Sequence, residues 1–330
     1  MIHLVGVVGW VEGVVHRACG SAGFADALVV GGGSRRLERI ATLVDWSRVE
    51  ALLSGVHASG TGRPSFRPLT LLKVLLLEGW YGLSDPAMEE ALGDRLSFRR
   101  FCGVSLDERV PDHSTISRFR SLLARDGLTE QIFDEVVRQL DAHGLVVKAG
   151  TLVDATLVAA AAAEPPRQKG GGRSDVDPEA TWQKHASGKA WFGYKLHLGV
   201  DRHSLIVRKA VLTPANVAEV EHGHDLVSGD EAAVWADKGY VGPRLRARLA
   251  QDGIRDRTQQ RAQRGHPLTA RQKHRNVLIG RVRGRIEGVF GTLKRSYGLH
   301  RMRFMGLARN RCATLLTLIA WNLGRAAARA

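Results

Sequence analysis

Three acidic residues in this chain lie in settings that suit metal-dependent chemistry on phosphate groups. Asp154 lies in the string TLVDATLV, Asp237 in VWADKGY, and Glu287 in RVRGRIEGVFGTLK. Carboxylate oxygens are the ligands that Mg²⁺ prefers, and two such ions can stabilise both the attacking and the leaving oxygen of a phosphodiester displacement. The three residues therefore indicate a metal site that only the fold can assemble from distant segments.

Two of the acids, Asp154 and Glu287, also have a plainer interpretation. Asp154, within a strand-like string, could simply accept local hydrogen bonds. Asp237 ends an apolar run, and the carboxyl ends of strands in open α/β sheets are where sites form. Glu287 follows Arg283 by four residues and precedes Lys294 by seven, so the three share one helix face. An exposed ion pair between Arg283 and Glu287 is the simple alternative there.

The chain carries a strong positive charge that is concentrated in one stretch. Its 330 residues include 48 Lys or Arg against 33 Asp or Glu, a formal net charge of +15. Between Arg255 and Arg311 there are sixteen Lys or Arg and two acids, so this stretch accounts for nearly all of the surplus. Such a concentrated field indicates a polyanionic partner. Nucleic acid fits better than a membrane, because the stretch does not separate into one basic and one apolar face.

The remaining composition favours a globular cytoplasmic protein. Hydrophobic residues make up 44% of the chain and charged residues 25%, which is enough apolar material for a core. No apolar run approaches the roughly 20 residues of a membrane-spanning helix, and the first residues lack the basic start of a signal peptide. Cys19, Cys102 and Cys312 are isolated, so neither a structural zinc site nor a disulfide framework is expected.

The period of the apolar residues divides the chain into a helical part and a strand-rich part. Residues 1–36 end in a Gly-rich string and are expected to form a poorly ordered leader. From 37 to 145 the apolar spacing predicts a small all-α domain. Residues 146–330 begin with three strand-like strings and continue with helices between further strands, which predicts an α/β domain. A segment rich in Gly, Pro and charge, about 163–189, is expected to be a flexible loop.

These settings together resemble those of the DDE transposases of bacterial insertion sequences, in the branch called the insertion-sequence-five family. The catalytic part of the resemblance lies in VDATLV at 153–158, WFGYKLHLGVD at 191–201, TPANV at 213–217, ADKGY at 236–240 and RVRGRIEGVFGTLK at 281–294. GLARNRCATLLTLIAWNLGR resembles the closing helix of the family. FRPLTLLKVLLLEGWYGLSDPAMEEAL and VPDHSTISRFR resemble its helical domain that binds DNA ends. The resemblance covers about 25–325.

The resemblance implies an RNase H-like mixed sheet with flanking helices, preceded by a smaller all-α DNA-binding domain. Asp154, Asp237 and Glu287 would hold two Mg²⁺ ions, for which Mn²⁺ can substitute. The implied function is binding of the element's ends, cleavage, and transfer of the freed 3′ hydroxyls to target DNA. Double-stranded DNA is the implied partner, bound by a homodimer or larger assembly close to the nucleoid.

The resemblance also assigns DNA contacts. The family's glutamate signature is Tyr, two residues, Arg, three, Glu, six, Lys; Arg283, Glu287 and Lys294 match it, and Gly280 replaces the tyrosine. Further DNA contacts are predicted from the residues themselves and not from the resemblance: Lys238, His197, His113, Ser114 and Arg118. For His197 a buried structural histidine is the alternative. For the last three the alternative is a capped helix of a bundle.

Two other functions compete with transposition. A decayed or co-opted transposase would keep the basic surface and act as a DNA-binding protein without turnover. The presence of all three carboxylates favours the active enzyme over that alternative. A magnesium-dependent nuclease without strand transfer would use the same three residues, so the sequence does not separate it from a transposase.

Overall fold

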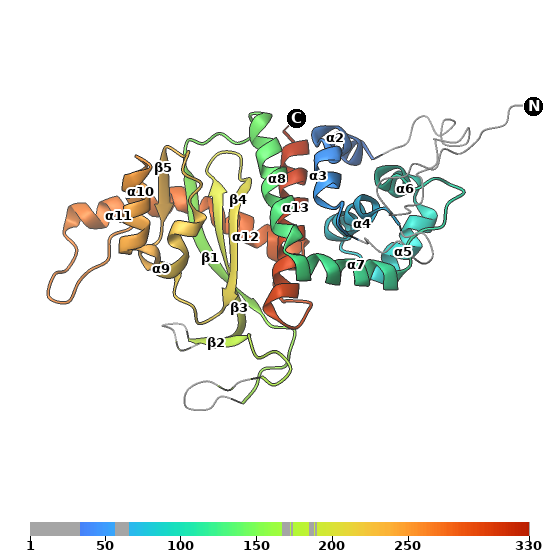
Figure 1. The fold of residues 1–330 in the computed structure, drawn as a ribbon. Coiled ribbons are helices and arrows are strands. Elements are labelled where there is room, and N and C mark those ends of the chain that lie inside the picture. Colours follow the sequence, from blue (N-terminus) through green and yellow to red (C-terminus); the bar gives the residue numbers. More distant parts are fainter. Residues whose placement is uncertain are drawn as a thin grey trace, which may run out of the picture.

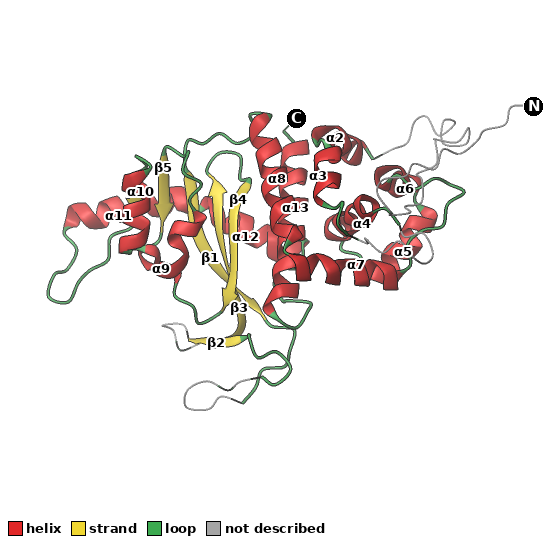
Figure 2. Cartoon of the chain, viewed as in Figure 1, coloured by secondary structure: helices red, strands yellow, loops and turns green. Residues whose placement is uncertain are grey.

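The computed structural model describes residues 34–56, 66–166, 172, 174–184, 188 and 190–329. Almost all of the predicted leader lies outside the described residues, as do residues 167–171, 173, 185–187 and 189 of the loop predicted at about 163–189. Residues 181–184 of that predicted loop instead form a strand, because they pair with a neighbouring strand. Within the described part, helices alone form the chain up to residue 142, and strands appear only after it (Figure 2). No helix of this part is long and apolar enough to cross a membrane.

The N-terminal part is a set of short helices, several of which begin and end at residues with clear capping signals. The helix α4 has Pro68 in its first turn and ends at Gly82, whose φ of 65° suits glycine. The Asp112 side chain caps α7, and Gly127 ends it in the same left-handed conformation. The helices are α2 (Arg35–Leu43), α3 (Trp46–Leu52), α4 (Pro68–Tyr81), α5 (Asp85–Asp94), α6 (Leu96–Cys102), α7 (His113–Asp126) and α8 (Leu128–Ala142).

The second part is built on a mixed sheet. Its strands are β1 (Thr151–Ala159), β2 (Thr181–Lys184), β3 (Ala190–Asp201), β4 (Val207–Pro214), β5 (Ala233–Ala236) and β6 (Arg255–Thr258). The strand β3 pairs antiparallel with β1, β2 and β4, whereas β1, β5 and β6 run parallel to one another. The predicted mixed α/β architecture is therefore confirmed, with β1 at the centre of the sheet.

Helices follow the strands and cover the sheet. They are α9 (Glu219–His222), α10 (Pro243–Gln251), α11 (Ala270–Arg283), α12 (Arg285–Ser296) and α13 (Leu307–Ala327), with the 3₁₀ turns η1 (Gly223–Leu226) and η2 (Lys238–Tyr240). The segment around Glu287 forms two helices, α11 and α12, since the hydrogen-bond pattern breaks at Gly284. The conformation of Gly284 stays helical, so Arg283 and Glu287 remain neighbours.

Two apolar clusters hold the sheet, one on each face. Leu152 of β1 belongs to the larger cluster, together with Ile286 and Val289 of α12. Val153 belongs to the smaller cluster, which β5, η1 and α10 complete. Because successive residues of a strand point to opposite faces, the next residue, Asp154, lies on the face that α12 covers.

The larger cluster continues from the sheet into the N-terminal helices. The helix α13 packs against α2, α4, α7 and α8 as well as β4 (Figure 1). The buried Asn322 side chain of α13 pairs with both the N–H and the carbonyl of Val207 in β4, each at 2.8 Å. The C-terminal helix thus joins the two parts of the chain around one apolar core.

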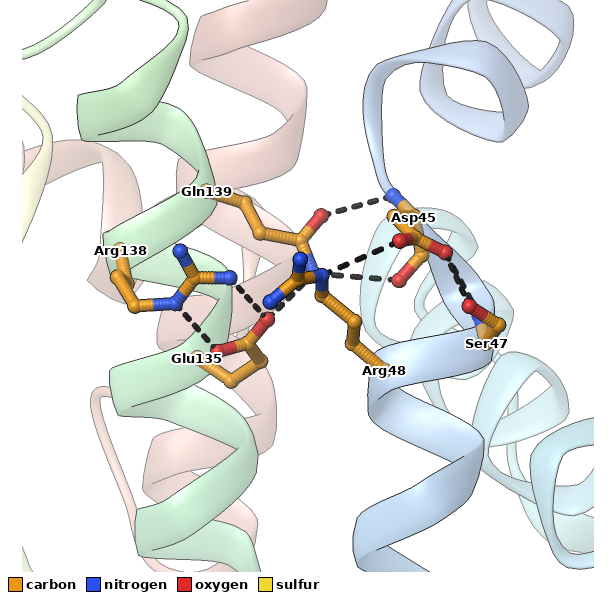
Figure 3. Close-up of polar contacts among 6 residues, drawn as sticks. All are labelled: Asp45, Ser47, Arg48, Glu135, Arg138 and Gln139. Atoms are coloured by element: carbon orange, nitrogen blue, oxygen red, sulfur yellow. Dashed lines mark hydrogen bonds and ion pairs between the residues drawn. The ribbon is translucent and has the colours of Figure 1, made fainter.

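The helix α8 completes the junction on its other side. The carboxamide of the buried Gln139 accepts from the Asp45 N–H at 2.7 Å and donates to the Asp45 carbonyl at 3.2 Å, which ties α8 to the start of α3 (Figure 3). The Glu135 carboxylate accepts a bidentate pair of hydrogen bonds from Arg138 on the same helix. The opposite side of α8 faces β4, where Lys209 lies 3.3 Å from Asp134.

Candidate metal and DNA site

Asp154 lies in β1, and Asp237 directly follows the neighbouring parallel strand β5. The register pairs Val153 of β1 with Ala236 of β5, so the next residue along each strand is one of the two aspartates. Adjacent strands run about 4.8 Å apart. Both paired residues belong to the smaller cluster, so both aspartates follow on the opposite face, where α12 packs. The fold thus brings together two of the three predicted ligands.

Glu287 is connected to Asp154 through an arginine. The Arg283 guanidinium forms an ion pair with Asp154 and lies 3.9 Å from the Glu287 carboxylate. Only 17% of the Asp154 and Arg283 side chains is exposed, against 70% of the Glu287 side chain. The sequence alone suggests an exposed ion pair between Arg283 and Glu287. In the structure Arg283 also pairs with Asp154, so this ion pair is part of a contact with the sheet.

The surroundings of Asp154 disfavour its charge. Burial raises the pKa of Asp154 from its usual 3.8 to about 6, although the nearby Arg283 charge opposes the rise. The negative charges of Asp237 and Glu219 raise the pKa further. One guanidinium thus compensates the charge of Asp154 only in part, which is the condition that an added cation would relieve.

The donor set suits a hard divalent cation, but the ligands are incompletely gathered. Asp154 presents carboxylate oxygens from within β1, and Asp237 presents them from the residue that follows the adjacent strand β5. Such oxygen ligands are what Mg²⁺ requires. Among residues 34–56, 66–166, 174–184 and 190–329, no three His, Cys, Asp or Glu side chains come close enough to hold one ion. Glu287 remains outside because its carboxylate lies beyond the Arg283 guanidinium. The two aspartates fit the implied metal, and Glu287 is its nearest predicted further ligand.

Behind the aspartates lies a buried histidine. His197 in β3 is fully buried, with Nδ1 3.1 Å from the Tyr240 hydroxyl and Nε2 3.2 Å from the Thr213 hydroxyl. Burial lowers the pKa of His197 to about 3, so the ring is neutral near pH 7. His197 therefore cannot reach DNA from this position, and it ties together β3, β4 and the turn that follows Asp237.

The two predicted lysine contacts differ in exposure. Lys238 is exposed, and its backbone N–H donates to the Asp237 side chain that caps η2. Lys294 of α12 is half-buried, and its Nζ donates to the Leu157 carbonyl of β1 at 2.9 Å. Burial also lowers the pKa of Lys294. Lys238 is thus open to a phosphate, whereas Lys294 is engaged in holding α12 against β1.

The N-terminal candidates form a surface on the first turns of α7. His113 lies 2.9 Å from Glu89, Ser114 donates to Asp112, and Arg118 donates back to the Ser114 hydroxyl. All three candidate side chains are exposed. His113 and Ser114 also line a cavity of about 710 Å³ between α4, α5, α7, α13 and the segment 297–304.

The site contains residues that the sequence did not single out. Glu219, at the start of α9, lies 3.9 Å from Lys195 and faces Gly239 in the turn after Asp237. Its position two residues after the TPANV string was the available signal. The segment around it predicts only a helix, because no local pattern relates it to strands so distant in the chain.

Comparison with known proteins identifies the family of the chain. Residues 30–122 match the family model described as "Transposase domain (DUF772)", and residues 147–323 match the one described as "Transposase DDE domain". The second match includes Asp154, Asp237 and Glu287 and covers more than half of the chain. No solved structure matches the chain. By its sequence, and with a mixed sheet that carries the paired aspartates, this chain belongs to the transposase DDE domain family.

Proposed function

We propose that this protein is a DNA transposase of the insertion-sequence-five family. It binds the ends of its element, cleaves phosphodiester bonds and transfers the freed 3′ hydroxyls to target DNA. The observation that carries the proposal is the β1–β5 register, since it sets Asp154 beside Asp237 on the face that α12 covers. The strand order supports an RNase H-like assignment, because an antiparallel group, β4, β3 and β1, continues into the parallel strands β5 and β6.

Asp154, Asp237 and Glu287 would hold the divalent ions, Mg²⁺ or Mn²⁺. Such ions polarise a phosphate and lower the pKa of a water or hydroxyl, so no nucleophilic side chain is required. The protein supplies a rigid mount for the aspartates, since both follow buried residues of paired strands. Burial also keeps bulk water from Asp154, which strengthens its interaction with any cation.

The cations around the site suit a phosphate backbone. Arg283 is held between Asp154 and Glu287 and presents a planar guanidinium, which matches phosphate geometry. The exposed Lys238 follows Asp237 directly and would neutralise a phosphate next to the scissile one. The basic stretch 255–311 and the exposed residues of α7 would extend the contact along the duplex. Two element ends require at least two protomers, so the active form is a dimer or larger.

Cleavage and joining of a labelled duplex that carries the flanking element end test the proposal. Wild type is compared with Asp237→Asn in Mg²⁺, and DNA binding is measured in parallel. We expect loss of both reactions at retained DNA affinity in the variant. Inactivity of both proteins despite tight binding would instead support the DNA-binding protein without turnover. Cleavage without joined products would support the magnesium-dependent nuclease.

A further inference from the structure

We infer that Glu219 is a further acidic group of this site, positioned to strengthen cation binding by the Asp154–Asp237 pair. The inference rests on the proposed function and adds a residue that the DDE signature does not contain. Glu219 is the first residue of α9, which packs against η2, the turn that follows Asp237. Its carboxylate therefore approaches the site from the end of β4.

The absence of a side chain at Gly239 leaves the space that the Glu219 carboxylate occupies. A Cβ atom added to Gly239 would lie only 2.1 Å from Glu219 Oε2. Any side chain at 239 would thus force the carboxylate away. Gly239 does not adopt a positive φ, so the need for glycine here is space and not backbone conformation. The carboxylate consequently rests on the turn two residues after Asp237.

Lys195 helps to hold the Glu219 side chain in position but neutralises its negative charge only in part. The Lys195 Nζ donates to the Val217 carbonyl at 2.8 Å and lies 3.9 Å from Glu219 Oε1. Its hydrogen bond thus goes to the backbone, and the ion pair with Glu219 is a long one. The Lys195 side chain is only 8% exposed, and that of Glu219 is 32% exposed. The Glu219 carboxylate is therefore fixed in position, and much of its negative electrostatic field remains uncompensated.

That field acts on the turn that follows Asp237. The Glu219 carboxylate lies against Gly239, two residues after Asp237, and α9 packs against η2. Negative charge therefore accumulates around Asp154, Asp237 and Glu219 beyond what Arg283 and Lys195 compensate. A divalent cation next to the aspartates would feel all three carboxylates.

Manganese binding by the full-length protein tests the inference apart from catalysis. Free Mn²⁺ is followed by electron paramagnetic resonance during titration of wild type, Glu219→Gln and Glu221→Gln, with the melting temperature of each. Glu221 is the matched control because it lies on the same helix and is exposed. We expect the Mn²⁺ Kd to rise about three- to tenfold in Glu219→Gln. Glu221→Gln should match wild type.

Gly239→Ala provides a second variant that keeps every charge. The added methyl displaces the flexible end of Glu219, so Mn²⁺ binding should weaken as in Glu219→Gln. In a Glu219→Ala background the same substitution should have no further effect. A wild-type Kd in Glu219→Gln, with or without a lower melting temperature, would overturn the inference and leave Glu219 as a structural partner of Lys195. Equal Mn²⁺ binding by wild type and Asp154→Asn would overturn the metal site itself.

Discussion

At the scale of single residues, the site depends on buried charges that lower the stability of the folded protein. Asp154 is largely buried beside one guanidinium, and its pKa is raised to about 6 mainly because burial disfavours the carboxylate. Such a group weakens the fold at neutral pH and is retained at functional sites. The sequence shows the aspartate and the strand-like string around it. The burial that raises its pKa could not be predicted from the sequence, because it comes from α12 and β5.

The raised pKa of Asp154 predicts a pH-dependent stability. Since the folded protein binds this proton more tightly than the unfolded chain, the stabilisation is complete below pH 3.8 and is lost as pH rises through 6. Relative to Asp154→Asn, wild type should lose about 2 kcal/mol of unfolding free energy between pH 4 and pH 7. Urea unfolding at pH 4 and pH 7 without divalent ions measures it. The exposed Asp107→Asn should parallel wild type, and a pH-independent difference for Asp154→Asn would contradict the account.

At the scale of elements, the position of α12 decides whether Glu287 belongs to the site. Ile286, Val289 and Leu293 are buried against the sheet, and the sequence periodicity predicts that face correctly. The contact is polar at both ends: Arg283, the last residue of α11, pairs with Asp154, and Lys294 of α12 donates to the Leu157 carbonyl. The sequence predicts the helix face but not its partner strand, because helix periodicity carries no information about which strand it covers.

Lys294 should therefore stabilise the folded protein even in the absence of DNA. In Lys294→Met the apolar stem remains, but the hydrogen bond to Leu157 is lost, at a cost of about 1 kcal/mol. Thermal unfolding without DNA measures the loss. Arg295→Met is the control, since the neighbouring arginine is exposed and bonds only within its own helix. Equal melting temperatures for the two variants would show that Lys294 does not anchor α12.

At the scale of the whole molecule, the helical part and the sheet share a core. The sequence predicts a helical region to about 145 and a strand-rich region after it, and the described helices and strands follow that division. The packing of the C-terminal α13 among α2, α4, α7 and α8 was not predictable from local patterns. Contacts between residues so distant in the chain depend on the complete fold. The exposed surface of α7, which we propose contacts DNA, thus lies on a helix that packs against α13, as β4 also does.

Asn322 tests this junction. Asn322→Leu removes both hydrogen bonds to Val207 and leaves a buried N–H and carbonyl without partners, so we expect a loss of about 2–4 kcal/mol. Chemical denaturation should still give one transition, because both parts share the core. Thr314→Val on the same helix is the control, since the buried Thr314 hydroxyl has no partner among the described residues. Two separate transitions in wild type would contradict a shared core.

The central claim is that Asp154, Asp237 and Glu287 form one metal site, and mapping that site with Fe²⁺ tests it without knowledge of the DNA sequence. Fe²⁺ bound in place of Mg²⁺ generates hydroxyl radicals with ascorbate and peroxide, which cut the nearest backbone. The account predicts cuts close to residues 154, 237 and 287 in wild type, suppressed by excess Mg²⁺ and absent in Asp237→Asn. Cuts confined to one of these segments, or unchanged in Asp237→Asn, would contradict it.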